Sequence, residues 1–408
     1  MKKIFYGWWI VLACFLIAFY VSGVIFYGFT AFFEPLIKEF GWSYTQVSFA
    51  ASLRGLEMGI FAPIVGFLVD RFGSRKLIFC GAIMVGVGLI LLSLTRSLTM
   101  FYIAFLILGF GGGGCTSVVT MSAVANWFEK DVGKAFGFMA SGFGASGLLI
   151  PLIVWLISVY GWRTTLVIMG LGMWMMGIPL SFIIRDKPEQ YGYKMDGGAA
   201  IRPSPSNKAV QAKAEMTFRM AIRHKTFLYL SITELVRMIA VTAVITHIMP
   251  YLGSLGISRS TAGLVAAAVP LWSIIGRLGF GCLADIFEKK YVMASAFCLM
   301  TIGMLAFSFG HIHWMILPFL FFFPPSMGGS MVLRGAVLRE NFGRGSFGKM
   351  LGIVMGAGSI GGIIGPTVAG LGYDILGSYQ SVWLLFAGLI GLNIFLVSRF
   401  ERVKELAS

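Results

Sequence analysis

Residues 66–76 read Gly66-Phe67-Leu68-Val69-Asp70-Arg71-Phe72-Gly73-Ser74-Arg75-Lys76 and close a long apolar run. A degenerate copy, Gly281-x-x-x-Asp285 followed by Lys289-Lys290, closes another apolar run in the second half of the chain. An acidic residue beside basic residues at a helix end can form a charge-assisted network that breaks and remakes as two parts of a protein move. The alternative is that these charges only fix the topology. Because the glycine and the aspartate both recur, we expect these residues to form a gate, that is, a contact between two parts of the protein that opens and closes. The expected gate residues are Gly66, Asp70, Arg71, Gly73, Arg75, Lys76, Gly281 and Asp285.

The composition indicates a membrane protein. The 408 residues are 58% hydrophobic and 12% charged, with a mean hydropathy of +0.86, whereas soluble domains average about 45–50% apolar and 25% charged residues. Only helices and closed barrels satisfy their backbone polar groups in lipid, and apolar runs of about 20 residues without alternation favour helices. The net charge of +15 does not indicate nucleic-acid binding, because the basic residues stand between the apolar runs.

Long apolar segments predict the transmembrane helices. They lie at about 8–33, 45–69, 77–95, 99–127, 134–160, 164–184, 226–252, 260–284, 291–310, 313–338, 347–372 and 379–399. The stretch from Arg185 to Lys225 is polar and rich in glycine and proline, which indicates a loop. We therefore expect an all-α membrane protein of 12 transmembrane helices, with an N-terminal six-helix bundle at 1–185, a cytoplasmic linker loop at 186–225 and a C-terminal six-helix bundle at 226–408.

Basic residues predict the orientation. With both termini inside, the exterior loops carry only Lys38, Arg96, Arg163 and Arg259, and most of the 32 Lys and Arg residues lie in cytoplasmic segments. The positive-inside rule therefore predicts N-in and C-in, with the gate on the cytoplasmic side. We expect a multi-pass monomer in the inner (plasma) membrane of the cell.

The two groups of six segments form a repeat with a constant offset, the one that carries Gly66 onto Gly281 and Asp70 onto Asp285. Identical residues recur at this offset without a gap, mostly Gly and Pro where turns and helix kinks are expected: Pro35, Gly41, Ser43, Gly66, Asp70, Gly133, Lys134, Gly137 and Pro151. Such a repeat is expected of two bundles related by an axis along the membrane normal.

The stretch at 66–76 resembles the major facilitator signature G-x-x-x-D-R-x-G-R-[RK], and its copy at Gly281 follows the eighth span as in that family, although Ile286 replaces the arginine. Two junctions, Asn126-Trp-Phe…Gly133-Lys-Ala-Phe-Gly137 and Glu340-Asn-Phe-Gly…Gly348-Lys-Met-Leu-Gly352, resemble those of the branch that holds oxalate/formate antiporters and monocarboxylate transporters. So does Gly161-Trp162-Arg163. The resemblance implies the major facilitator fold and transport by alternating access, but these junctions indicate ancestry more than substrate.

Ionisable residues lie inside the spans, where each costs about 2.5–3.5 kcal/mol and by default faces the bundle interior or a wet cavity. Arg277 and Arg334 have no partner nearby in the sequence. The other four form pairs at i,i+3 spacing, in which each carboxylate can neutralise its helix neighbour: Arg54 with Glu57, and Glu234 with Arg237. The surplus of two positive charges predicts attraction of an anion, which arginine can bind with two parallel hydrogen bonds.

Arg277 is the first candidate for substrate binding, because in the resembling branch an arginine of the eighth span holds the substrate carboxylate. A structural bond to a backbone carbonyl or to a distant glutamate is the alternative. Arg334 is a second candidate, but it lies shortly before Glu340 and could instead snorkel to the cytoplasm or join the gate. Arg54 could supply a further charge.

His247, in the outer half of the seventh span, is a candidate proton carrier and substrate contact, because histidine changes its charge near neutrality. A lone membrane histidine can also be structural. Bacterial monocarboxylate transporters have a histidine on the seventh span that works with the arginine of the eighth, which implies the same role here. Animal monocarboxylate transporters carry an aspartate where this chain has Ser273, so proton coupling would use His247, Glu57 or Glu234.

Two further features concern the lining between the bundles. Tyr27 and Trp272 could wall a small cavity, although packing is the alternative for single aromatic residues in an aromatic-rich chain. Small residues at 141–147 and 356–362 are expected to pack tightly across the two halves.

We therefore expect a secondary active transporter of a small organic anion, above all a monocarboxylate, which is symported with a proton or exchanged by antiport for a counter-anion. One alternative is an exporter of amphipathic drugs or metabolites. Another is a dicarboxylate or inorganic anion antiporter, although the oxalate-binding lysine of the eleventh span has no counterpart except Lys349 at its start. A sensor would need an added signalling domain. No nucleophile–base set, cofactor motif or metal-ligand spacing is present in the sequence, so we expect no enzyme activity, no cofactor and no metal.

Overall fold

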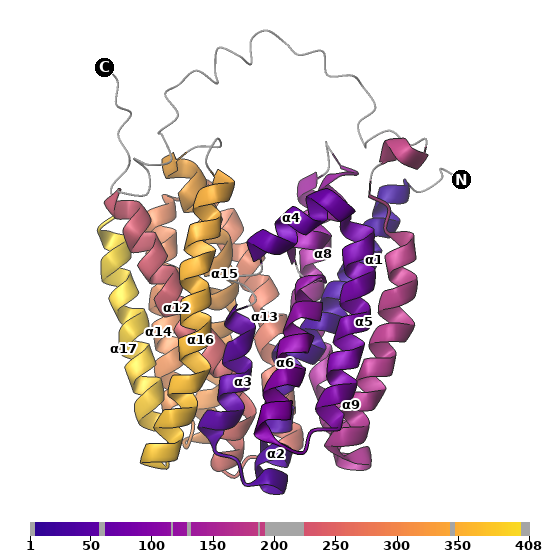
Figure 1. Cartoon of the computed structure of the whole chain (residues 1–408). Helices are drawn as coiled ribbons and strands as arrows, with labels where there is room; N and C mark the ends of the chain where they lie inside the picture. The colour runs from indigo at the N-terminus through magenta and orange to yellow at the C-terminus, as the bar shows by residue number, and fades with distance from the viewer. Residues whose placement is uncertain are drawn as a thin grey trace.

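The computed structural model describes residues 5–56, 62–115, 117–128, 132–186, 188–191, 224–342 and 347–400. Every secondary-structure element within these ranges is a helix. Figure 1 shows the helices running side by side, with the second half of the chain on one side and most of the first half on the other, and with α3 of the first half next to α16. The prediction of an all-α protein is therefore confirmed for the described residues.

The elements of the first half are α1 (Tyr6–Val21), the π-helix η1 (Ser22–Tyr27), the 3₁₀-helix η2 (Gly28–Phe32), α2 (Phe33–Phe40), α3 (Tyr44–Leu56), α4 (Ala62–Phe72), α5 (Ser74–Ser93), α6 (Leu98–Gly113), α7 (Ser117–Ala125), α8 (Val132–Ala145), η4 (Ser146–Leu148), α9 (Leu149–Ile183) and η5 (Pro188–Tyr191). Those of the second half are α12 (Lys225–Ser254), α13 (Arg259–Ile286), α14 (Lys289–Ser308), η6 (His313–Met315), α15 (Ile316–Phe342), α16 (Phe347–Leu376) and α17 (Gln380–Ser398).

Ten helices within the described ranges are long and apolar enough to cross a membrane. The longest, 135–183, contains Gly161 with φ 78° and ψ 163°. This conformation is not helical, so the segment consists of two helices that meet at a kink. The helices α3 and α4 have 13 and 11 residues, so each alone is too short to span a bilayer of about 30 Å.

The constant offset of the sequence repeat reappears in the helix starts. α3 and α13 begin at Tyr44 and Arg259, α5 and α14 at Ser74 and Lys289, and α8 and α16 at Val132 and Phe347. The turns before α3 and α13 also match, because Gly41 and Gly256 have φ values of 67° and 78°. Left-handed backbone of this kind favours glycine, which explains why a glycine recurs at this position.

Three helices of the second half contact the first half. α16 packs on α3, α13 packs on α8, η4 and α9, and α12 packs on η1 and η2. Gly147 allows the second contact, because a Cβ on this residue would lie 2.4 Å from the carbonyl oxygen of Ala267. The small residues of α16 behave differently from the prediction. Gly358 and Gly361 lie against α12 of their own half, whereas the cross-half contact of α16 is made further along, at Gly370.

We call the end of the bundle where α1 begins and α17 ends the terminal end, and the opposite end the far end. The far end carries the turns at Gly41, Gly161, Gly256 and Gly377. Most of the hydrogen bonds described between the halves lie there, including Met249 N to Thr30 Oγ1 at 3.2 Å and Ser52 Oγ to Thr367 Oγ1 at 2.8 Å. The far end is therefore the closed end in this structure.

Candidate functional site

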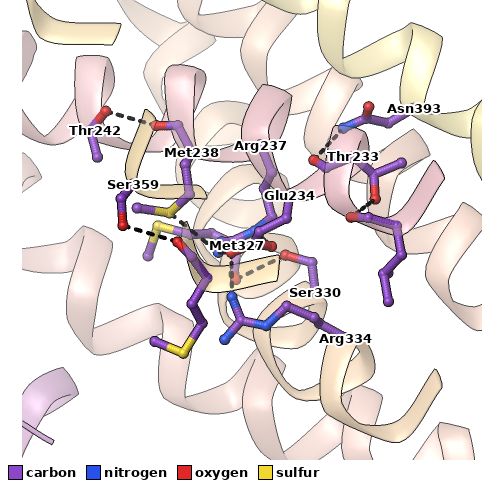
Figure 2. A network of polar contacts seen from close by, with 12 residues as sticks. Thr233, Glu234, Arg237, Met238, Thr242, Met327, Ser330, Arg334, Ser359 and Asn393 are labelled. Carbon is purple, nitrogen blue, oxygen red and sulfur yellow. Dashed lines mark hydrogen bonds and ion pairs between the residues drawn. The ribbon is translucent and has the colours of Figure 1, made fainter. Parts of the chain in front are cut away.

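A buried cluster of three charged side chains lies within the second half. Glu234 and Arg237 stand on one face of α12, and the Arg237 guanidinium donates to both carboxylate oxygens, Nη2 to Oε1 at 2.7 Å and Nε to Oε2 at 2.9 Å. Arg334 reaches from α15 and donates to the same Oε1 (Figure 2). The exposed fractions are 3% for Glu234, 5% for Arg237 and 7% for Arg334. With all three groups ionised, the cluster carries one net positive charge.

The surroundings of the cluster hold the carboxylate in place. Gly358 of α16 lies against it, since a Cβ on this residue would be 3.1 Å from Glu234 Cγ. The Arg237 Nη2 atom also donates to the Met238 sulfur at 3.4 Å. Arg334 Nε is buried without a hydrogen-bond partner among the described residues. Buried charges are costly unless they are paired, so the two arginines depend on one shared carboxylate.

Arg277 of α13 faces the first half. Its Nη1 donates to the carbonyl oxygen of Ala140 in α8 at 3.4 Å, which is a long bond. Its Nε is buried and has no hydrogen-bond partner in the part of the chain that the structure describes. A guanidinium has five donors in a fixed fork, so Arg277 has donor capacity left for an anionic ligand.

The first half contributes an irregular segment opposite these arginines. The first span changes from α1 to the π-helix η1 and then to the 3₁₀-helix η2, and Tyr27 is the last residue of the π-helix. A Cβ on Gly28 would lie 2.4 Å from the carbonyl oxygen of Gly23, so the bend requires glycine. The Tyr27 hydroxyl is within electrostatic range of Arg277 and Arg237. Short π-helical segments occur often at functional sites, where they redirect a side chain.

His247 lies away from this cluster, near the far end. It is fully buried, and both ring nitrogens are bonded: Nε2 to Ser48 Oγ at 2.9 Å and to the Pro366 carbonyl oxygen at 3.0 Å, and Nδ1 to the Tyr379 hydroxyl at 3.0 Å. A carbonyl oxygen only accepts, and the Ser48 hydroxyl already donates to the Tyr44 carbonyl. The partners therefore fit a neutral imidazole with its proton on Nε2, where Nδ1 accepts from Tyr379.

The other predicted site residues divide into two groups. Trp272 is 42% exposed and stands on the opposite face of α13 from Pro270 and Ile274, which contact the first half. The Trp272 side chain therefore does not face the region between the halves where Arg277 lies. Arg54 belongs to α3, but the position of its side chain is not among the described features, and Glu57 lies outside the described residues. Their predicted pairing stays a prediction.

Comparison with known proteins identifies the family. A family model described as Major Facilitator Superfamily matches residues 9–254 and 230–407. The chain belongs to the Major Facilitator Superfamily. The assignment made from residues 66–76 is thus confirmed.

Relatives of this major facilitator protein include monocarboxylate transporters. Monocarboxylate transporter 13 of Bos taurus is 23% identical over 384 residues, which cover 93% of this chain and 86% of that protein. Monocarboxylate transporter 12 of Rattus norvegicus is 25% identical over 406 residues, with 93% and 82% covered. An uncharacterized MFS-type transporter of Bacillus subtilis is 24% identical over 373 residues, with 88% of each chain covered. The resemblance to the monocarboxylate transporter branch is confirmed, at low identity.

Solved structures of other facilitators share the fold. The D-xylose-proton symporter matches with a TM-score of 0.76 at 16% identity, and 98% of each chain is covered. A bacterial homologue of the human lysosomal transporter Spinster, inward-facing and occupied, matches with a TM-score of 0.73 at 17% identity, again over 98% of each chain. These structures show the shared fold. The family membership and the transporter relatives show that this facilitator is a membrane-spanning transporter of a small molecule and not an enzyme.

The signature stretch of this facilitator joins α4 to α5. Gly73 precedes α5 with φ 83°, and a Cβ on it would lie 2.4 Å from Asp186 Oδ2. The other Asp186 oxygen, Oδ1, accepts from the Arg75 backbone N–H at 3.1 Å. Asp186 thus reaches the first turn of α5 because residue 73 has no side chain. This explains a glycine of the signature that the sequence alone does not explain.

The junction before α8 is tied to the same place. Asn126 Nδ2 donates to the Asp186 carbonyl oxygen at 2.9 Å, and Trp127 Nε1 donates to the Arg185 carbonyl oxygen at 2.8 Å. These bonds fix the end of α9 to the helices before it. The junction is therefore architectural in this half, in agreement with its interpretation as a sign of ancestry.

The remaining gate residues are only partly described. Arg71 and Lys76 are exposed, Gly281 is half-buried, and the side chains of Asp70 and Asp285 and the burial of Gly66 lie outside the described residues. In the second half, Lys289 forms an ion pair with Glu340 of α15 at 3.4 Å. The two residues lie far apart in the sequence, and no local pattern indicates that they pair.

Proposed function

We propose that this facilitator is a secondary active transporter of small organic anions, with a monocarboxylate as its substrate, and that it works by alternating access. The observation that carries the proposal is the under-satisfied Arg277 guanidinium between the halves, whose Nε is buried without a partner among the described residues. Its Nη1 bond to Ala140 is long enough to be exchanged for a bond to a carboxylate. The related monocarboxylate transporters support the substrate class.

In this proposal the substrate carboxylate binds Arg277, and Tyr27 closes the site from the first half. Arg334 is a further contact, because its Nε lacks a partner within the described ranges. Arg54 and His247 stay as more distant candidates for the substrate path, whereas Trp272 faces away from the first half and is not included. A carboxylate that pairs with Arg277 neutralises a charge that is costly to enclose, which favours closure around the substrate.

Coupling is proposed to use a proton or an exchanged anion. His247 is one proposed carrier: if its Nδ1 becomes protonated, the Tyr379 hydroxyl can turn and accept a hydrogen bond from the Nδ1–H. Glu234 holds two arginines, so a proton on it would release both from their shared partner. Glu57 is the third candidate.

A dicarboxylate or inorganic anion antiporter is the second candidate function. One observation favours it: Arg334 as well as Arg277 has a buried Nε without a hydrogen-bond partner among the described residues. A dicarboxylate has one carboxylate for each of these two arginines. Among the described residues, no feature favours an exporter of amphipathic drugs.

We also propose 12 transmembrane helices with both termini inside. Gly161 divides the helix at 135–183 into two spans, and α3 with α4 supplies the remaining one. In this arrangement the far end is exterior, residues 1–185 and 226–408 form the two bundles, residues 186–225 form the cytoplasmic linker, and the protein is a monomer in the plasma (inner) membrane. The terminal-end residues of the signature then form the cytoplasmic gate.

The test is counterflow in proteoliposomes with labelled monocarboxylates, dicarboxylates, nitrate and phosphate esters at two pH values. Arg277→Ala should lower the apparent affinity for the anion about 10- to 100-fold, because a charged hydrogen bond contributes about 1.5–3 kcal/mol. Arg277→Lys should restore part of it. Arg96→Ala is the matched control, since Arg96 is an exposed arginine between α5 and α6. Undiminished uptake by Arg277→Ala at normal expression would remove Arg277 from the site.

A further inference from the structure

Asp374, near the end of α16, binds the first turn of α3 across the boundary between the halves. Its Oδ1 accepts from the Tyr44 N–H at 3.1 Å, and its Oδ2 accepts from the Thr45 N–H at 2.8 Å and from Thr45 Oγ1 at 2.5 Å. Since α3 begins at Tyr44, these two N–H groups have no partner within their own helix. A negative charge at a helix N-terminus is also favoured by the helix dipole.

The cap that α3 carries in its own sequence does not reach these two groups. Ser43 Oγ accepts from the Gln46 N–H at 3.1 Å, and Gln46 Oε1 accepts from the Ser43 N–H at 3.0 Å, which together form a capping box. Ser43 thus satisfies the third N–H of the helix. The first and second N–H groups are satisfied by the other half of the molecule.

A glycine of α16 allows α3 and α16 to approach each other closely. Gly370 lies one turn before Asp374, and a Cβ on it would be 2.6 Å from Ser48 Oγ and 2.9 Å from the Tyr44 carbonyl oxygen. Ser48 in turn bonds His247 of the second half. Gly370 therefore lets α3 lie close enough for Asp374 to reach its end, and one glycine-x-x-x-aspartate unit provides both the space and the charge.

We propose that Asp374 is a conformational latch, which holds α3 against α16 while the far end is closed and releases α3 when that end opens. The proposal rests on the transport function proposed above, because only a protein that opens at both ends needs contacts that form and break. The chemistry suits a reversible contact. Asp374 is exposed and the α3 cap residues Tyr44 and Thr45 are half-buried at the end of the bundle, so both partners can be hydrated after separation. Buried bonds such as those of Glu234 could not be exchanged for water so readily.

The test measures the far-end distance between the halves without any substrate. Spin labels are placed at Arg96→Cys and His311→Cys, two exposed positions in far-end loops that are equivalent in the sequence repeat, after the five native cysteines have been replaced. Double electron–electron resonance then gives the fraction of molecules whose far end is open. Asp374→Ala should raise the ratio of open to closed molecules about 2- to 30-fold, which is the range for loss of a helix N-cap. Asp374→Asn keeps one accepting oxygen and should raise the ratio less. Thr45→Val removes only the hydroxyl bond and should have a smaller effect in the same direction.

Glu39→Gln is the matched control. Glu39 is also a far-end carboxylate held by several donors, Trp162 Nε1 at 2.6 Å and Arg163 Nη2 at 2.7 Å, but all of them belong to its own half. Its loss should leave the distance distribution unchanged. The latch is refuted if the Asp374 variants keep the wild-type distribution, or if Glu39→Gln opens the far end equally. Because the distances are measured without substrate, a wrong assignment of the anion would show in the Arg277 uptake assay and not here.

Discussion

The shared carboxylate of the buried cluster allows a quantitative prediction. Glu234 is the counter-ion of both Arg237 and Arg334, and all three residues are at most 7% exposed. Glu234→Gln leaves two buried guanidinium groups without an anion, whereas Arg334→Met leaves the bidentate pair of Glu234 and Arg237, which is neutral. Removal of one partner of a buried pair costs about 3–5 kcal/mol. We therefore expect that cost for Glu234→Gln and a clearly smaller one for Arg334→Met.

The assay is thermal unfolding of the purified protein in detergent. For 408 residues, an unfolding entropy of about 2.1 cal/mol/K per residue converts 3–5 kcal/mol into a fall in Tm of about 4–6 °C. The double variant Glu234→Gln/Arg334→Met should recover part of this loss, because one uncompensated charge remains instead of two. The reasoning is refuted if Arg334→Met destabilises as much as Glu234→Gln, or if the double variant is the least stable of the three.

Two predictions concern the first half. Gly73→Ala should destabilise by about 1–3 kcal/mol, because it strains a backbone at φ 83° and displaces Asp186 from α5; Gly137→Ala, a helical glycine with no atom within 4 Å of the added Cβ, should be neutral or slightly stabilising in the same thermal assay. Arg163→Ala should lower Tm more than the exposed control Arg96→Ala, because Arg163 also donates to two backbone carbonyl oxygens, of Ser93 at 2.5 Å and of Thr95 at 3.0 Å. Equal Tm values for the two members of either comparison would show that these contacts do not stabilise the fold.

The sequence predicts local and periodic features of this protein well. Apolar runs indicate the helices, the constant offset of the repeat indicates matching helix starts, and the spacing of Glu234 and Arg237 places them on one face of α12. The sequence does not predict contacts between residues that are far apart along the chain. The bond from Arg334 to Glu234 joins residues 100 positions apart, and no local pattern selects it over a role at the gate.

The same limit applies to His247 and to the first span. The partners of His247, among them Ser48 and Tyr379, come from three other helices or their ends, so its environment depends on how the halves meet. Hydropathy does not predict the π-helix that ends at Tyr27, because the whole first span has the mean hydropathy of an ordinary transmembrane helix. The glycines at 23 and 28 were the available signal, since a glycine pair inside a span permits a close backbone approach.

The course of α16 links two features that lie far apart in space. Gly358 in this helix lies against Glu234, and Asp374, further along the same helix, holds the start of α3. At a rise of about 1.5 Å per residue the two points are about 24 Å apart along the axis. One helix thus contacts the buried cluster of its own half and the first turn of α3 in the other half. If α16 shifts beside Glu234 in the transport cycle proposed above, the segment with Asp374 belongs to the same helix, so the start of α3 at the far end is the place where that shift is felt in the other half.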